Sequence, residues 1–168
     1  MRAVFESEDT QLLEYTPTVA KPLYTDFEPM RLTRRIRLLL ELFRPGKYVV
    51  YYLQKSGRLV GYCVVTAGGR RLKCSTRRDI VLGPSYIERS ERGKGYGKEL
   101  IELVLRVSEF EYAYDWIEKG NTASRKASER CGFLPYAELN VTPILRRLVP
   151  AEHGEDIVYR YRKPTAEG

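Results

Sequence analysis

The segment Arg92-Gly-Lys-Gly-Tyr-Gly-Lys98 is the most informative stretch of this sequence. A strand is predicted immediately before it, over residues 79–87. Apolar residues at helical spacing predict an amphipathic helix immediately after it: Leu100, Ile101, Val104 and Leu105. Glycines let a backbone bend and approach a ligand closely, and the first amides of a helix attract anions. The segment is therefore predicted to form a phosphate-binding loop.

Two common phosphate-binding patterns do not fit this loop. The P-loop pattern GxxxxGK[ST] would need a glycine where Arg92 stands and a hydroxyl where Glu99 stands. The dinucleotide pattern GxGxxG lacks its third glycine in either possible register. The pattern that does fit is RxxGxG, formed by Arg92, Gly95 and Gly97.

The rest of the chain predicts a mixed α/β order. Strands are predicted at residues 48–53, 59–66, 79–87, 112–118, 133–141 and 157–161. A hairpin turn is expected at 55–58, and Gly83-Pro84 predicts a bulge inside its strand. Asn121 or Thr122 is expected to cap a short helix that ends at Gly132.

The amino-terminal region is harder to interpret. Leu12, Leu13, Tyr15 and Val19 suggest an edge strand, whose length Pro17 and Pro22 would limit. A helix is expected from Thr25, where Thr25 and Glu28 form a capping box, until Pro45-Gly46 stops it.

Composition limits the class of protein. The 168 residues, 43% hydrophobic and 30% charged, suit one globular domain over residues 1–168. Neither a membrane-spanning stretch nor a secretory signal is recognisable. Cys63, Cys74 and Cys131 are odd in number and widely spaced, and His153 is the one histidine, so we expect reduced thiols, a cytoplasmic location and no metal site. The net charge of +7 weakly favours an anionic partner.

A second motif follows the loop at a defined distance: Asn121-Thr-Ala-Ser124 and then Cys131-Gly-Phe133. Together with RxxGxG this resembles the GNAT family of N-acetyltransferases, over about residues 48 to 139. The resemblance implies a single acyl-CoA N-acyltransferase domain with a central mixed, mostly antiparallel, splayed sheet flanked by helices. It also implies acetyl-CoA as cosubstrate and direct attack by a primary amine in a ternary complex.

The resemblance assigns cofactor-binding roles to specific residues. Backbone groups of two strand residues, Tyr86 and Ile87, would hold the pantetheine arm. Asn121 and Ser124, at the start of the second helix, would also contact this arm. The pyrophosphate would be held by the loop residues Arg92, Gly93, Lys94, Gly95, Tyr96, Gly97 and Lys98. A small-molecule amine acceptor is expected rather than nucleic acid or a membrane, and homodimers are common in the family.

The sequence departs from the family at the catalytic positions. Many members have a general-acid tyrosine where this chain has Ser128, and a proline is common where it has Arg89. Ser128 could relay a proton through water, and Glu88 could accept the amine proton. Five tyrosines are alternative acids: Tyr86, Tyr96, Tyr112, Tyr114 and Tyr136.

Two other functions stay open at this stage. The substitution at Ser128 also suits a CoA-binding regulatory domain that has lost catalysis. The basic segments 31–37 and 70–78 suit a nucleic-acid-binding module, although no specific motif supports it. Arginines at 31, 34, 35, 146 and 147 suggest an acidic acceptor, such as a phosphorylated or nucleotide-linked amino sugar.

Overall fold

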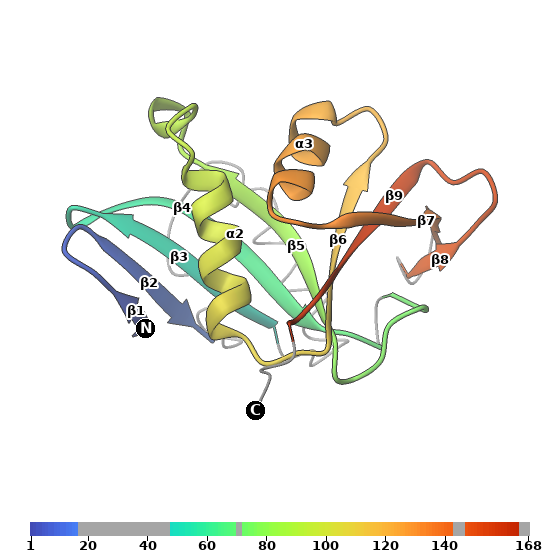
Figure 1. Ribbon diagram of the computed structural model, residues 1–168, viewed down its shortest axis with the longest axis horizontal. Helices are drawn as coiled ribbons and strands as arrows, with labels where there is room; N and C mark the ends of the chain where they lie inside the picture. The colour runs from blue at the N-terminus through green and yellow to red at the C-terminus, as the bar shows by residue number, and fades with distance from the viewer. Residues whose placement is uncertain (17–47, 70–71, 143–146, 165–168) are drawn as a thin grey trace.

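A computed structural model describes residues 1–16, 48–69, 72–142 and 147–164. These residues form one nine-stranded sheet in the order β1-β2-β3-β4-β5-β6-β9-β7-β8 (Figure 1). The strands span Arg2–Glu6 (β1), Thr10–Tyr15 (β2), Tyr48–Lys55 (β3), Arg58–Ala67 (β4), Ile80–Ile87 (β5), Tyr112–Glu118 (β6), Leu134–Val141 (β7), Leu148–Pro150 (β8) and Asp156–Arg162 (β9). The described helices are a 3-10 turn at Arg89–Glu91, α2 at Tyr96–Val107 and α3 at Thr122–Arg130. The expected mixed, mostly antiparallel sheet with flanking helices is confirmed.

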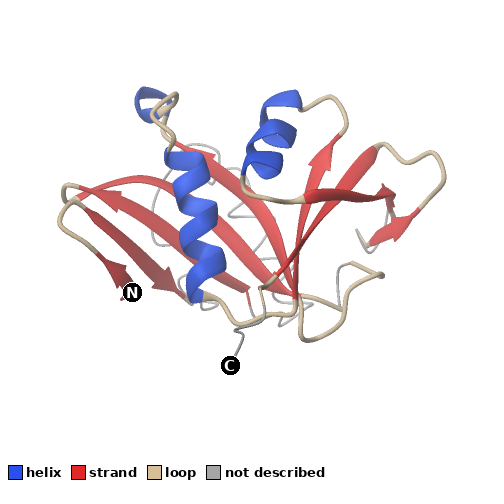
Figure 2. Cartoon of the chain, viewed as in Figure 1, coloured by secondary structure: helices blue, strands red, loops and turns tan. Residues whose placement is uncertain are grey.

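The loop-to-helix arrangement also matches the sequence pattern. Helix α2 begins directly after Gly95 and packs against the sheet through a buried face that includes Leu100, Ile101 and Val104. Helix α3 is capped by Asn121 and is followed by Gly132, whose φ of 84° is the left-handed conformation that glycine tolerates. Figure 2 shows α2 crossing in front of the sheet and α3 near the end of β6, and the two helices contact each other.

Alternation along the strands builds a core on each face of the sheet. On β3, Tyr51 and Leu53 join the cluster beneath α2, whereas Val50 and Tyr52 join a cluster on the opposite face. This period of two is what the apolar run 48–53 predicts for a strand buried on both faces. The expected turn between β3 and β4 is present, with Ser56 and Gly57 at positive φ.

The amino-terminal strands differ from the expectation. Leu12, Leu13 and Tyr15 lie in β2, which pairs with both β1 and β3 and is therefore not an edge strand. The edge is β1, whose residues RAVFE are too short and too charged to signal a strand. The helix expected from Thr25 lies outside the described residues.

Candidate active site

The only parallel pairing of described strands, between β5 and β6, ends in a fork. The two strands pair at Ile80–Ala113, Val81–Tyr114 and Leu82–Asp115, and no farther. Beyond Leu82, β5 continues to pair with β4, after a register shift opposite the Gly83-Pro84 bulge. The fork follows from this bulge, because it turns β5 toward β4 and away from β6. One edge of β5 therefore has no neighbouring strand among the described residues.

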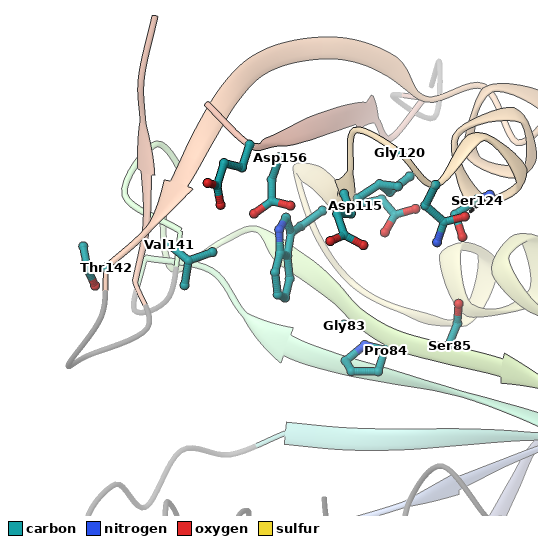
Figure 3. A pocket seen from close by; sticks show the side chains of 14 residues that line it. Gly83, Pro84, Ser85, Asp115, Gly120, Ser124, Val141, Thr142 and Asp156 are labelled. Carbon is teal, nitrogen blue, oxygen red and sulfur yellow. Dashed lines mark hydrogen bonds between the residues drawn. The ribbon is translucent and has the colours of Figure 1, made fainter. Parts of the chain in front are cut away.

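An open cavity of about 1010 Å³ lies at the fork (Figure 3). It is lined by residues 83–85 of β5, 115–118 of β6, Gly120, Asn121 and Ser124 at the start of α3, 141–142 at the end of β7, and 155–156 at the start of β9. The cavity thus has one end beside the free edge of β5 and another beside β7 and β9. Such a shape can hold two ligands that meet near the fork.

The glycine loop follows the carboxyl end of β5, and α3 follows the carboxyl end of the parallel strand β6, at the same end of the sheet. Gly93 and Gly95 have φ values of 82° and 84°, and a Cβ built on either would meet no atom within 4 Å. Among the described residues, the backbone amides of 93–98 donate no hydrogen bond to another protein group. Unpaired amides of this kind, at the positive end of a helix dipole, attract anions.

The loop's basic side chains are held by neighbours. The Nε of Arg92 donates to the carbonyl of Ile87 at 3.1 Å, and its guanidinium lies 5.4 Å from the Tyr86 ring centre. Lys94 pairs with Glu91 at 2.8 Å, and Lys98 pairs with Glu102 at 3.4 Å. Both lysine side chains are about half exposed, although Glu91 is only 14% exposed, so water screens these pairs and weakens them.

Helix α2 is fixed to the sheet close to the loop. Lys55 of β3 forms an ion pair with Glu99 of α2 at 2.7 Å, and the Lys55 side chain is only 13% exposed. The same ammonium contacts the Thr10 hydroxyl and lies 5.2 Å from the centre of the Tyr96 ring. This network links β2, β3 and the first turn of α2, so it positions the loop amides.

Asn121 and Ser124 lie at the cavity as well as at the helix start. The Oδ1 of Asn121 accepts a hydrogen bond from the Ser124 amide at 3.1 Å, which confirms the predicted cap. Both residues line the cavity. The Asn121 side-chain amide nitrogen is a second polar group that can donate a hydrogen bond.

Asp115, the last β6 residue before the fork, is a site residue that was not predicted from the sequence. Its side chain lines the cavity, and its carboxylate accepts hydrogen bonds from the Ser128 hydroxyl and the Trp116 amide. Burial raises the pKa of Asp115 from 3.8 to about 6, although both hydrogen bonds lower it. A sequence signal existed: Ala113, Asp115 and Ile117 share one strand face, and the two apolar members lie in the core.

None of the catalytic candidates from the sequence lines the cavity, although Ser128 contacts Asp115, which does. Ser128 is buried, with 1% of its surface exposed, and its hydroxyl contacts Asp115. Glu88 caps the 3-10 turn by accepting from the Arg89 amide at 3.2 Å and is not among the residues that line the cavity. None of the five candidate tyrosines lines the cavity either. Burial raises the pKa of Tyr114 to about 12, which makes it a weak acid.

The family model for the acetyltransferase (GNAT) family matches residues 12–133. The chain therefore belongs to this family. The match contains the fork, the glycine loop and both described α-helices, so the family features and the site geometry fall on the same residues.

Solved structures of acetyltransferases share the fold. RimL, a ribosomal-protein α-N-acetyltransferase in complex with coenzyme A, matches with a TM-score of 0.59 and 11% identity over 96% of this chain and 98% of its own. MccE, the microcin C7 self-immunity acetyltransferase in complex with acetyl-CoA and AMP, matches with a TM-score of 0.58 and 11% identity over 94% of both chains. A ribosomal-protein-alanine acetyltransferase from Vibrio fischeri gives 0.55 and 14% over 98% of both.

No curated protein matches the sequence significantly. Among the described residues, no helix is both long enough and apolar enough to cross a membrane. The described residues also contain no group of three or more His, Cys, Asp or Glu side chains that could hold a metal ion.

Proposed function

We propose that this protein transfers an acetyl group from acetyl-CoA to a primary amine. The observation that carries the proposal is the fork between β5 and β6, with the cavity at the fork and the glycine loop after the carboxyl end of β5. An extended ligand arm can pair with the free edge of β5 as an added strand would, while its phosphates lie on the loop amides.

The residues present fit acetyl-CoA. The open space around Gly93 and Gly95 leaves room for a pyrophosphate against the amides of 93–98. In this proposal the pantetheine arm is held by backbone groups near Tyr86 and Ile87, at the end of β5, and by Asn121 and Ser124, which line the cavity. Bound there, acetyl-CoA supplies an activated acetyl thioester.

Asp115 is the proton acceptor in this proposal. A base works best when its pKa lies near the working pH, and about 6 meets that condition better than an ordinary carboxylate does. Its place at the fork lies between the two ends of the cavity, where an acceptor amine and a thioester would meet. Ser128 holds the Asp115 carboxylate in position.

Calorimetric titration of the full chain with acetyl-CoA, and separately with ATP and NAD, tests the donor assignment. We expect micromolar binding of acetyl-CoA alone. Gly95→Ala should weaken it at least tenfold, because alanine strains a φ of 84° and its methyl group occupies the open space proposed for the pyrophosphate.

Gly57→Ala is the matched control. Gly57 has a φ of 79° with no atom within 4 Å of a built Cβ, but it lies in the β3–β4 turn. The backbone strain is similar in the two variants, but Gly57 lies outside the glycine loop. Acetyl-CoA affinity should therefore stay within twofold for Gly57→Ala. Equal binding of all three ligands, or equal losses in both variants, would refute the loop assignment. Tight binding without transfer to any amine would indicate a regulatory domain instead.

A further inference from the structure

The acceptor end of the cavity is acidic although the chain as a whole is basic. Four of the described lining residues carry carboxylates: Asp115, Glu118, Glu155 and Asp156. None of the described lining residues is a lysine, an arginine or the histidine. In a chain with a net charge of +7, this local reversal creates a negative potential where an acceptor would enter.

Asp156 is the most informative of these carboxylates. It is the first residue of β9, lies between Glu118 of β6 and Leu139 of β7, and is 8% exposed. Within the described part of the chain, no hydrogen bond or ion pair reaches its carboxylate. Figure 3 shows its side chain at the same cavity as that of Asp115. The carboxylate oxygens are not fully enclosed by protein, so a cationic ligand group in the cavity can pair with them.

The chemistry of the lining favours an organic cation over a metal. The cavity carboxylates do not come together as a metal-binding group among the described residues. They instead lie along the paired strands β6 and β9, where Asp156 is opposite Glu118 and Asp115 is three residues farther along β6. Separate carboxylates suit a ligand with positive charges spaced along a chain.

We propose that the acceptor is a small diamine or polyamine, bound by Asp156 and the neighbouring carboxylates; this rests on the proposed acetyl transfer. One ammonium group pairs with Asp156, and the reacting amino group lies near Asp115. This differs from the acidic acceptor suggested by the sequence. Of the arginines behind that expectation, only Arg147 is described, and it does not line the cavity.

The reaction balances with the groups at hand. The acceptor nitrogen forms an amide bond to the acetyl carbon as the carbon–sulfur bond breaks. The reacting ammonium loses two protons in total. One passes through Asp115 to solvent, and the other ends on the departing thiol.

Thiol release from acetyl-CoA, measured over matched amines, tests the proposal. We expect kcat/KM for spermidine and 1,3-diaminopropane to exceed that for n-propylamine at least tenfold, and glucosamine 6-phosphate to react least. Asp156→Asn should lower kcat/KM for the two diamines at least tenfold and so remove most of their advantage over n-propylamine. Glu109→Gln is the control, because it removes the same charge from a side chain that is 97% exposed and outside the cavity.

Two further measurements separate the possible failures. Glu118→Gln alters an exposed carboxylate of the same cavity and should raise the KM for spermidine, so the test survives if Asp156→Asn does not fold. Calorimetry of spermidine with the protein–CoA complex should show binding that weakens with added salt. Equal kcat/KM for mono- and diamines, or preference for the phosphorylated sugar or for a basic peptide, would overturn the acceptor proposal alone. Absence of acetyl-CoA binding would overturn the proposed function.

Discussion

Asp115 is the residue on which the proposed chemistry depends, and its raised pKa has a cost in stability. A carboxyl whose pKa rises from 3.8 to about 6 on folding destabilises the folded state once it is ionised. The penalty grows as the pH rises between these values and is complete above about 6. Its upper limit is about 3 kcal/mol, at about 1.4 kcal/mol per pKa unit.

Asp115→Asn should therefore separate activity from stability. We expect kcat/KM to fall at least 100-fold, because asparagine accepts no proton. The thermal unfolding temperature at pH 7.5 should stay equal or rise, and the gain should shrink at pH 4.5. The wild-type pH–rate profile should have an acidic limb near pH 6 that the residual activity of the variant lacks. A loss of stability at pH 7.5 with activity retained would contradict this role.

Asp79→Asn is a comparison variant in which loss of a buried carboxylate should destabilise the folded state. Asp79 lies directly before β5. Asp79 is 3% exposed and accepts hydrogen bonds from the Thr76 amide at 2.6 Å, the Thr76 hydroxyl at 2.9 Å and the Tyr112 amide at 3.1 Å. Asparagine leaves some of these donors unpaired, so we expect a loss of about 1–3 kcal/mol in unfolding free energy. Urea unfolding of Asp115→Asn and Asp79→Asn measures the change in unfolding free energy for each variant. Equal changes in the two variants would contradict the prediction.

At the scale of elements, the pairing of β4 with β5 holds the strand that leads into the loop. A Cβ at Gly61 would lie 2.5 Å from the Tyr86 carbonyl oxygen and from the Ile87 side chain. Gly61→Ala should push the end of β5 away, with a loss of about 1–3 kcal/mol in stability. Acetyl-CoA affinity should fall with it, because Arg92 is anchored on the Ile87 carbonyl. Unchanged affinity would show that the end of β5 does not position the ligand.

The position of α2 is tested through the Lys55–Glu99 pair. Lys55→Met keeps an apolar stem but leaves the Glu99 carboxylate without its partner at 2.7 Å. We expect a destabilisation of about 1–3 kcal/mol and a loss in acetyl-CoA affinity below tenfold, because this pair positions the amides and does not contact the ligand. Denaturant unfolding and calorimetry measure the two effects. The double variant with Glu99→Gln should recover part of the stability.

The elements also show how far the sequence could be interpreted. The spacing of RxxGxG between a strand and an amphipathic helix was sufficient to predict the loop, and Asn121 and Gly132 were sufficient to predict the ends of α3. Asp115 escaped prediction because its importance depends on where β5 leaves β6, which is a property of strand pairing. The role of Asp156 likewise depends on the convergence of β6, β7 and β9.

At the scale of the molecule, charge divides the site into two functional ends. The loop after β5 carries Arg92, Lys94 and Lys98 together with the positive end of α2, which suits phosphates. The far side of the cavity, at Glu155 and Asp156, suits ammonium groups. The fork in the sheet, where Asp115 lies, joins the two ends and is where transfer would take place.

Hydrogen–deuterium exchange with and without saturating acetyl-CoA tests this account most directly. Ligand bound along the free edge of β5 should slow exchange in peptides covering 83–98 and 119–124. The β1–β2 hairpin, residues 2–15, should exchange unchanged. Protection confined to segments other than β5, the loop and the start of α3, or no protection at saturation, would contradict the claim that the fork is the acetyl-CoA site.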